Sequence, residues 1–167
     1  MKISGMISRR KMLGGGAALM AGGVAASLLP FDTPADAKAF PLTLTDAQWR
    51  KRLTPGQYAV LRQAATERPY TSPLNKEHRN GLFVCAGCEQ KLFSSATKYD
   101  SGTGWPSFWK PLPGGVGTDT DYKLGYPRTE VHCARCGGHL GHVFDDGPKP
   151  TGKRYCMNGV AMRFIAA

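Results

Sequence analysis

The sequence predicts a mainly β protein, an antiparallel β-sheet domain with short N-terminal helices and a structural zinc site. From residue 82 onward, Gly, Pro, Asp and Asn interrupt the chain every few residues, which is typical of short strands joined by turns. Two helix-start signals stand one after the other before this region. Two Cys-x-x-Cys pairs, Cys85/Cys88 and Cys133/Cys136, lie within the β region and have metal-ligand spacing.

The expected elements begin with an extended segment over residues 38–44, followed by two short helices. Thr45 and Gln48 form a capping-box pattern at the start of the first helix. Thr54 opens the second in the same way, with proline at its first turn, and this helix should end before Pro69. The apolar positions expected to face the core are Trp49 and Leu53 in the first helix and Tyr58, Leu61 and Ala65 in the second.

Strands are expected over residues 82–84, 122–124, 129–132, 140–144, 154–157 and 160–165. In the last segment, apolar Val160, Met162 and Phe164 alternate with the residues between them, as expected of a strand with one face in a core. Beyond the two cysteine pairs, the sequence shows no internal repeat.

The four paired cysteines suit a zinc ion. Each short loop brings two sulfurs close together, and two such loops supply the tetrahedral set that a structural Zn²⁺ requires. The predicted ligands are Cys85, Cys88, Cys133 and Cys136. Disulfides are the alternative, because the chain also carries an export signal and an oxidising compartment favours them.

Residues 1–37 are predicted to be a twin-arginine-type signal peptide. Arg9 and Arg10 precede an uncharged stretch over residues 12–29, and Ala35 and Ala37 occupy the small-residue positions of a cleavage site. The mature domain, residues 38–167, would then lie in the periplasm. Because this route exports folded proteins, zinc could be loaded in the reducing cytoplasm first. The alternative is a membrane anchor, but Gly and Ala make up more than half of the stretch, so we expect cleavage and no stable membrane insertion.

The chain is basic, with a formal net charge of +10 over 167 residues. Such a charge can indicate nucleic-acid binding, and zinc ribbons often bind nucleic acid. The basic residues are scattered, however, and their longest runs contain three residues. We therefore expect a basic surface that helps solubility and attracts acidic partners weakly, and no nucleic-acid partner.

Cys156 is the one cysteine outside the two pairs. It stands near Lys153 and Arg154, whose positive charges favour the thiolate and hence nucleophilicity. The alternative is an inert buried cysteine, which is the common state of a single cysteine.

Two histidines and an asparagine belong to the same pattern. His139 and His142 follow the second cysteine pair, and Asn158 comes two residues after Cys156. Cysteine with histidine and asparagine is a nucleophile set, because an imidazole can relay a proton while an amide fixes geometry. Taken singly, each histidine is more often a hydrogen-bonded polar residue, or even an additional zinc ligand, than a catalytic group.

Five motifs occur in order: CAGC at 85–88, SGTGWPSF at 101–108, VHCARC at 131–136, GHLGHVFDDGP at 138–148 and RYCMN at 154–158. Together they resemble the motifs of the B-type methionine sulfoxide reductases, which are specific for the R epimer. The segments LTP at 53–55 and TERP at 66–69 match as well. The resemblance extends over nearly all of residues 44–166.

The resemblance implies that the protein reduces methionine-R-sulfoxide in oxidised proteins. Cys156 would attack the sulfoxide sulfur and become a sulfenic acid. Arg154 would lower the pKa of the thiol, and Trp105 would present its indole face to the substrate methyl group rather than only pack beside its neighbours. The residues implied in protonating the sulfoxide oxygen are His142 with His139, through a hydrogen-bond network with Asn158.

The chain departs from the family pattern at Thr103, where many members carry a resolving cysteine. The resemblance therefore implies a one-cysteine enzyme whose sulfenic acid is reduced by an external thiol, such as that of a thioredoxin-like protein. Gly159 and Met157 are smaller departures within the Cys156 segment. Two other functions remain as alternatives: an exported zinc-stabilised binding module with an inert Cys156, and a thiol-based oxidant sensor.

Overall fold

The computed structural model describes residues 39–167, so the predicted signal peptide and cleavage site lie outside the described residues. The helices and 3₁₀ helices are α1 (Asp46–Arg52), α2 (Pro55–Gln63), η1 (Pro73–Lys76), η2 (Ser95–Thr97) and η3 (Gly159–Ala161). The strands are β1 (Gly81–Cys85), β2 (Lys91–Ser94), β3 (Lys98–Tyr99), β4 (Ser107–Phe108), β5 (Val116–Asp121), β6 (Arg128–Cys133), β7 (His139–Phe144), β8 (Arg154–Met157) and β9 (Met162–Ala166).

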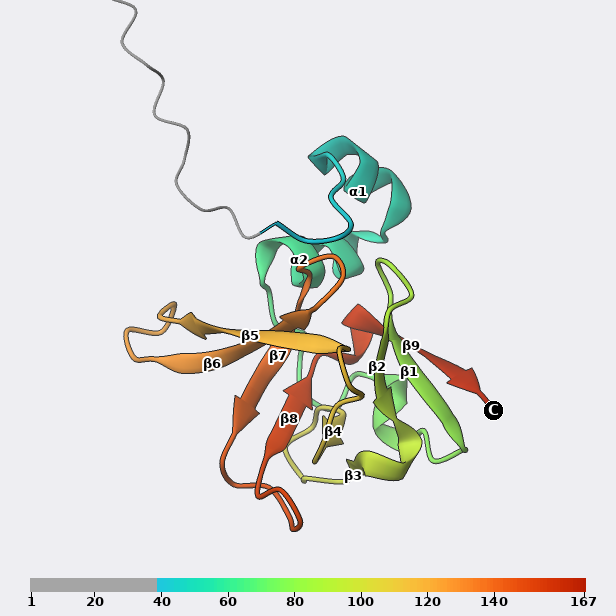
Figure 1. Ribbon diagram of the computed structural model, residues 1–167, viewed down its shortest axis with the longest axis vertical. Coiled ribbons are helices and arrows are strands. Elements are labelled where there is room, and N and C mark those ends of the chain that lie inside the picture. Colours follow the sequence, from blue (N-terminus) through green and yellow to red (C-terminus); the bar gives the residue numbers. More distant parts are fainter. Residues whose placement is uncertain (1–38) are drawn as a thin grey trace, which may run out of the picture. The chain divides into compact units, whose positions relative to one another are not determined.

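The strands form two antiparallel sheets, which confirms the predicted fold class (Figure 1). The smaller sheet has the order β2-β1-β9, and the larger has the order β3-β4-β8-β7-β6-β5. Aromatic rings from both sheets meet in the core: Phe93 of β2 stacks on Phe108 of β4 with ring centroids 4.3 Å apart, and Phe83 of β1 meets the same ring at 4.9 Å. Burial of these rings holds the sheets together.

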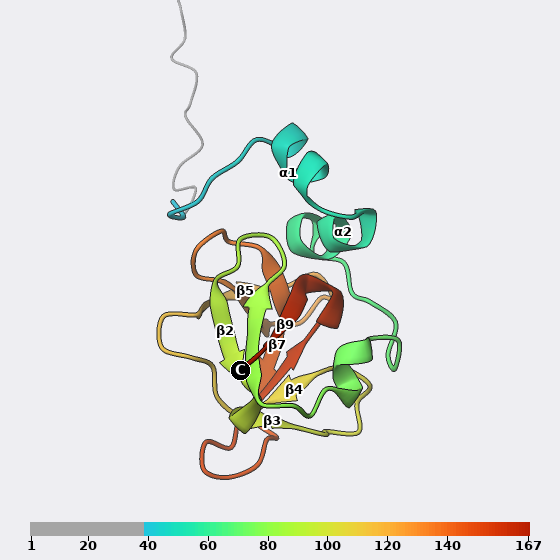
Figure 2. The same cartoon turned by 90° about the vertical axis from the view of Figure 1, so that its right-hand side faces the viewer.

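The two predicted helices are confirmed, and they lie together beyond one end of the sheets (Figures 1 and 2). Each begins with a complete capping box, formed by Thr45 with Gln48 and by Thr54 with Gln57. The second helix ends at Gln63, because the next residue, Ala64, adopts a left-handed conformation. The helices bury Trp49, Tyr58, Val60 and Leu61.

Five of the predicted strands are present, and one prediction is wrong. Residues 122–124 lie in the turn between β5 and β6, where Tyr122 and Leu124 are exposed and a glycine at 125 has a positive φ. The predicted strand over 160–165 begins only at Met162, because the residues before it form η3. From there the expected alternation holds, since Met162 is buried and Arg163 is exposed.

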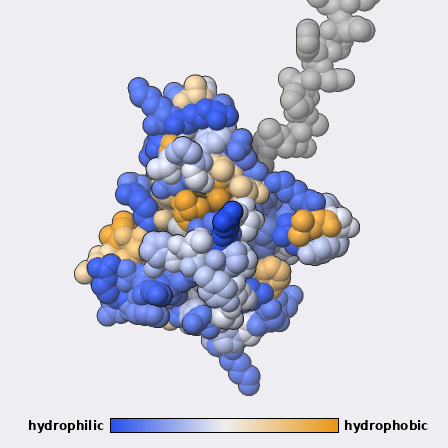
Figure 3. All heavy atoms as spheres, turned by 180° about the vertical axis from the view of Figure 1, so that it is seen from behind, coloured by the Kyte–Doolittle hydropathy of each residue, from blue (hydrophilic) through white to orange (hydrophobic). Residues whose placement is uncertain are grey.

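Large hydrophobic side chains at the surface are few: Tyr70, Tyr122, Leu124, Tyr126 and Ile165 are the exposed ones within the described chain. On the face opposite to that of Figure 1, hydrophobic residues form separate patches rather than one continuous area (Figure 3). Over residues 39–167, no helix has the length and apolar character needed to cross a bilayer.

Candidate active site and metal centre

The two Cys-x-x-Cys pairs meet in space. Cys85 is the last residue of β1, and Cys88 lies in the turn after it. In the same way, Cys133 is the last residue of β6, and Cys136 lies in the turn that follows. The sulfurs of Cys85 and Cys136 are 3.8 Å apart, those of Cys88 and Cys133 are 3.4 Å apart, and all four lie within 4.8 Å of one another. The cluster therefore connects a turn of the smaller sheet to a turn of the larger one.

The cluster has the composition of a closed metal site. All four side chains are buried, and no disulfide joins any pair of cysteines within residues 39–167. Hydrogen bonding to Cys133, together with burial, raises the pKa values of Cys85 and Cys136. A bound cation would favour ionisation of all four thiols together, since metal ligation requires thiolates. Four thiolates leave no position open for water, so a metal here would be structural.

Cys156 lies at the centre of the larger sheet. Its strand, β8, runs between β4 and β7, and Cys156 is paired with Ser107 on one side and with His142 on the other. The side chain is partly buried, and its sulfur lies 3.8 Å from the hydroxyl oxygen of Thr103. The rigid sheet therefore fixes the position of the predicted nucleophile.

The surroundings of Cys156 differ from the sequence expectation. Burial raises the pKa of the thiol, and Thr103 and Arg154 oppose this effect. Arg154 is held by Asp146 through two hydrogen bonds of 2.9 and 2.8 Å, and Lys153 pairs with Asp145. Arg154 acts in the predicted direction, but desolvation is the larger effect on the resting thiol.

A small pocket of about 130 Å³ opens beside Cys156. It is too small for an ordinary drug-sized ligand and suits the end of one side chain. Two aromatic residues in its lining offer the apolar surface that thioethers and methyl groups prefer. The lining residues are Thr66, Trp105, Arg128, Gly141, His142, Phe144, Cys156 and Asn158.

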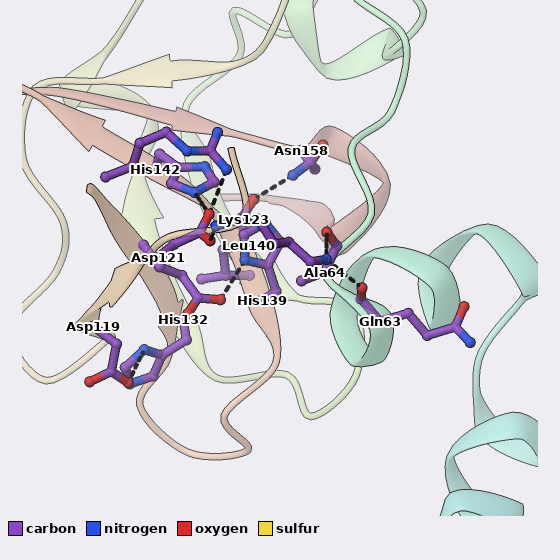
Figure 4. A network of polar contacts seen from close by, with 12 residues as sticks. Gln63, Ala64, Asp119, Asp121, Lys123, His132, His139, Leu140, His142 and Asn158 are labelled. Atoms are coloured by element: carbon purple, nitrogen blue, oxygen red, sulfur yellow. Dashed lines mark hydrogen bonds and ion pairs between the residues drawn. The ribbon is translucent and has the colours of Figure 1, made fainter. Parts of the chain in front are cut away.

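His142 reaches this pocket from β7. Its Nε2 lies 2.7 Å from a carboxylate oxygen of Asp121, toward which its ring points in Figure 4. Burial lowers the pKa of His142, and Asp121 opposes this. The pKa of Asp121 is itself lowered to about 2 by hydrogen bonds from the Lys123 backbone and from His142. An ionised Asp121 therefore holds a proton on Nε2 and stabilises the imidazolium form.

His139 lies behind His142 and is not among the residues that line the pocket. The two ring centroids are 5.4 Å apart in an edge-to-face arrangement. Nδ1 of His139 lies 2.5 Å from the carboxylate of Glu130 on the neighbouring strand, β6. The structure thus brings both predicted histidines together, with His142 next to the pocket and His139 supporting its ring.

Asn158 and Trp105 line the pocket and are held by one residue, Glu67. The amide of Asn158 donates to the carbonyl of Leu140 at 3.0 Å, as Figure 4 shows, and its oxygen accepts from the backbone N–H of Glu67 at 2.9 Å. The indole N–H of Trp105 donates to the Glu67 carbonyl at 3.1 Å. Asn158 therefore joins β7 to the segment after α2, and these hydrogen bonds fix both predicted site residues.

A larger and more open pocket of about 610 Å³ lies between α2, η1 and η3. Its lining is mostly apolar and contains neither cysteine nor histidine. Thr66 lines both pockets, so the two are neighbours. The thiol of Cys156 and the imidazole of His142 therefore share the smaller pocket.

Sequence reasoning missed several residues of the site. Asp121 and Glu130 orient the histidines, Arg128 and Phe144 line the pocket, and Glu67 supports its wall. The TERP segment was the only available signal for Glu67. The two acids stand in polar stretches without a motif, and only strand pairing brings them to the histidines.

Comparison with known proteins agrees with this geometry. The SelR domain family matches residues 53–166. The peptide methionine sulfoxide reductase MsrB of Agrobacterium fabrum is 54% identical over 121 residues, which is 72% of this chain and 90% of that protein. The protein of the same name from Leptospira interrogans is 51% identical over 75% of this chain and 96% of its own length. The chloroplastic peptide methionine sulfoxide reductase B1 of Arabidopsis thaliana is 50% identical over 74% of this chain and 62% of its length.

The matched region includes both cysteine pairs, the pocket residues and Cys156. The family model covers more than half of the chain, and the bacterial relatives are aligned over most of their length. The chain therefore belongs to the SelR family, the B-type peptide methionine sulfoxide reductases.

Proposed function

We propose that this protein is a peptide-methionine (R)-S-oxide reductase that acts on oxidised proteins, with Cys156 as its nucleophile. The observation that supports this most directly is the pocket in which the one cysteine outside the metal cluster meets His142 and the indole of Trp105. The pocket admits the end of a methionine sulfoxide side chain, with Trp105 and Phe144 available to contact its methyl group.

In the first step, the thiolate of Cys156 attacks the sulfoxide sulfur and takes its oxygen. The sulfur–oxygen bond of the substrate breaks, the thioether of methionine leaves, and Cys156 becomes a sulfenic acid. The substrate is reduced by two electrons and the cysteine is oxidised by two. The oxygen must gain a proton as it leaves, and His142 is placed to deliver it, with Asp121 stabilising its imidazolium and His139 holding the ring.

In the second step, the sulfenic acid is reduced by two equivalents of an external thiol. The first forms a mixed disulfide and releases water, and the second restores the Cys156 thiol and yields a disulfide of the reductant. We propose a one-cysteine enzyme because the other four cysteines are buried together in the metal cluster. A thioredoxin-like protein is the class of reductant that fits this chemistry.

We propose that the metal is one Zn²⁺ ion, held by Cys85, Cys88, Cys133 and Cys136. A set of four thiolates is the usual structural zinc site. The ion would fix the two turns together and take no part in the reaction. Within the described residues, neither His139 nor His142 belongs to this cluster, so the histidines stay available for catalysis.

We also propose export to the periplasm through the twin-arginine route, with residues 1–37 removed. The support is Arg9 and Arg10 together with the small residues Ala35 and Ala37. N-terminal sequencing of the protein from a periplasmic fraction should find Lys38 first. Changing both arginines to lysine should trap the precursor, and a functional protein in the cytosol that retains Met1 would contradict the proposal.

The decisive test of the activity is stereochemical. Purified protein with dithiothreitol is given a racemic peptide methionine sulfoxide, and the remaining epimers are resolved by chromatography. We expect consumption of the R epimer alone over many turnovers, and no consumption by Cys156→Ser. The variant should keep its metal and its melting temperature, which separates loss of chemistry from loss of fold.

The same assay distinguishes the two alternatives. A zinc-stabilised binding module would consume neither epimer. A thiol-based oxidant sensor would show a reactive Cys156 without stereoselective turnover. Equal consumption of both epimers, or full activity without Cys156, would refute the proposed function.

A further inference from the structure

Three hydroxyl groups form a chain that ends at the sulfur of Cys156. The oxygen of Thr103 lies 3.8 Å from that sulfur, the oxygen of Ser101 lies 2.8 Å from that of Thr103, and the oxygen of Ser107 lies 2.7 Å from that of Ser101. At the far end, the hydroxyl of Ser107 donates to the carbonyl of Trp105 at 3.1 Å. The thiol is therefore connected to a continuous line of rotatable donors.

The loop that carries Ser101 and Thr103 is fixed in place. Gly102 and Gly104 have φ values of +71° and +93°, a region that favours glycine, and these residues give the loop its tight shape. The hydroxyl of Tyr70 donates to the Gly102 carbonyl at 2.7 Å, and the backbone N–H of Tyr70 donates to the Gly104 carbonyl at 2.7 Å. These hydrogen bonds fix the loop and so hold the hydroxyls of Ser101 and Thr103 near the sulfur of Cys156.

Ser107 is fixed by the sheet. It lies on β4 directly opposite Cys156, and its side chain is fully buried. A buried hydroxyl that is hydrogen-bonded at both ends belongs to a network in which each bond polarises the next. The chain of hydroxyl groups thus has one end fixed in the sheet at Ser107 and the other end at the sulfur of Cys156.

Charged and titratable groups also lie beside Cys156: Arg154 lowers its pKa through its charge and a hydrogen bond, and Arg128 and His142 line the same pocket. Arg154 is paired with Asp146, and Lys153 with Asp145. Among the single contributions that lower the pKa of Cys156, the hydrogen bond with Thr103 is the largest, followed by the charge of Arg154 and by hydrogen bonds with Arg154 and Ser107. A thiolate at a buried position needs donors that touch the sulfur itself, because desolvation penalises the charged form.

We propose that the hydroxyl chain of Thr103, Ser101 and Ser107 stabilises the Cys156 thiolate alongside Arg154, and that this hydroxyl chain reverses its direction when the thiol ionises. The proposal deepens the proposed function and rests on it for its catalytic meaning. It assigns to Thr103 the role of a donor to the nucleophile.

The count of protons makes the reversal possible. With Cys156 as a thiol, the S–H donates to Thr103, Thr103 donates to Ser101, Ser101 to Ser107, and Ser107 to the Trp105 carbonyl. When the thiol proton leaves to solvent, Thr103 rotates to donate to the sulfur and Ser101 rotates to donate to Thr103. Ser107 then rotates to donate to Ser101, and the carbonyl of Trp105 gives up this donor. No covalent bond between heavy atoms breaks in the three hydroxyl side chains, and the thiolate gains a donor through three hydroxyl rotations.

The hydroxyl chain reaches the Cys156 sulfur from outside the pocket. Within residues 39–167, the pocket lining includes Cys156 but none of the three hydroxyl residues. The pocket side of the sulfur thus stays open to the sulfoxide while the hydroxyls act from another direction. The substrate and the hydroxyl chain therefore do not compete for the same side of the Cys156 sulfur.

The test measures the pH dependence of Cys156 alkylation by iodoacetamide on zinc-loaded protein, with the modified peptide quantified by mass spectrometry. In Thr103→Val, which keeps the shape and removes the hydroxyl, the midpoint should rise by about one pH unit, the equivalent of one lost hydrogen bond to a charged group. Thr103→Ser, which keeps the hydroxyl, should restore a midpoint close to that of the unaltered protein. Ser101→Ala should also raise the midpoint, but by a smaller amount, because Ser101 bonds to Thr103 and not to the sulfur.

Thr97→Val is the matched control, because its hydroxyl donates to the carbonyls of Ser94 and Lys110 instead of joining the chain. It should leave the midpoint unchanged. An unchanged midpoint in both Thr103→Val and Ser101→Ala would overturn the proposal, as would an equal rise in Thr103→Ser. Alkylation needs no sulfoxide, so this outcome is read separately from turnover. If the unaltered protein had no reductase activity but the alkylation midpoint still rose in Thr103→Val, the proposed function would be refuted and the hydroxyl-chain proposal would be supported.

Discussion

The carboxylate of Glu67 accepts a hydrogen bond of 2.5 Å from the backbone N–H of Gly159, although 92 positions separate the two residues in the sequence. The same carboxylate accepts from the N–H of Val160 at 3.1 Å. The backbone of Glu67 holds the indole of Trp105 and the amide of Asn158. One residue after α2 thus fixes both the segment that follows Cys156 and one wall of the pocket.

Glu67→Gln should weaken this junction. The amide oxygen can accept from one of the two N–H groups and leaves the other without an acceptor, which should lower the free energy of unfolding by about 1–3 kcal/mol. Because the segment also positions Trp105 and Asn158, we expect KM for the peptide sulfoxide to rise more than kcat falls. Urea unfolding and steady-state kinetics measure the two effects, and a variant equal to the unaltered protein in both would contradict this role.

The Glu67 variant should also show a defined pH dependence. Burial raises the pKa of Glu67, against the hydrogen bonds from Gly159 and Val160. The folded state therefore binds this proton more tightly than the unfolded state. The stability advantage over Glu67→Gln should be largest below the unfolded pKa and should shrink as the pH rises through the folded value. Unfolding at about pH 4 and about pH 7 tests this, and an advantage that grows with pH would show that the sign is wrong.

Asp121→Asn should shift the pH–rate profile to lower pH. Asp121 raises the pKa of His142 against the effect of burial, so its removal should lower that pKa further. If the imidazolium of His142 delivers the proton to the sulfoxide oxygen, kcat should be retained in acid and should fall near neutral pH. The alkaline limb of the pH–rate profile should therefore move to lower pH by about one unit. Asp119→Asn, on the same strand, is the control and should leave the limb in place. An unmoved limb in Asp121→Asn would exclude His142 as the proton donor.

Removal of the metal should destabilise the junction between the sheets. Cys133→Ser, or prolonged chelation, should lower the melting temperature by about 10 °C or more, because binding of a structural metal contributes directly to folding. Cys156→Ser is the matched control and should retain one zinc per chain by metal analysis. Two intact disulfides in protein folded in the cytoplasm, or substoichiometric zinc in fully stable protein, would contradict the metal assignment.

Thr103→Cys should convert the protein into an enzyme with a resolving thiol. The Thr103 oxygen lies 3.8 Å from the Cys156 sulfur, so a modest rotation would bring a sulfur at this position within bonding distance. After substrate and without reductant, peptide mapping should find a disulfide between positions 103 and 156.

The unaltered protein given the same treatment should form a dimedone adduct at Cys156 and no intramolecular disulfide. Thr97→Cys is the control and should behave like the unaltered protein. A disulfide between Cys156 and a cysteine of the metal cluster in the unaltered protein would disprove both the one-cysteine cycle and the purely structural role of the metal.

Features that depend on near neighbours in the chain could be predicted from the sequence. The capping boxes at Thr45 and Thr54 start both helices where expected, because cap and backbone lie within one turn. The Cys-x-x-Cys spacing predicted the four-sulfur cluster, and the alternation after Met162 predicted the last strand. The same spacing left Cys156 outside the two pairs, and the motifs around it made it the predicted nucleophile.

Short strands without a periodic pattern could not be predicted. The strands β3 and β4 contain two residues each, and β5 combines a glycine with threonines and aspartates. Such segments are extended only because a neighbouring strand supplies hydrogen bonds. Residues 122–124 looked like a strand by composition, but they connect β5 to β6 in a turn. Composition describes what a segment favours, and pairing decides what it forms.

The sequence by itself determined which residues could carry the chemistry: a thiol, an imidazole pair, an indole and four metal-binding sulfurs. Only the tertiary structure decided how they act together. It hydrogen-bonds Asp121 to His142 and the backbone of Glu67 to Trp105 and Asn158, and it brings the Thr103 hydroxyl beside Cys156. The physical reason is that each of these contacts joins residues from separate elements, so its distance depends on strand order, register and loop closure, which the pattern of neighbouring residues does not encode.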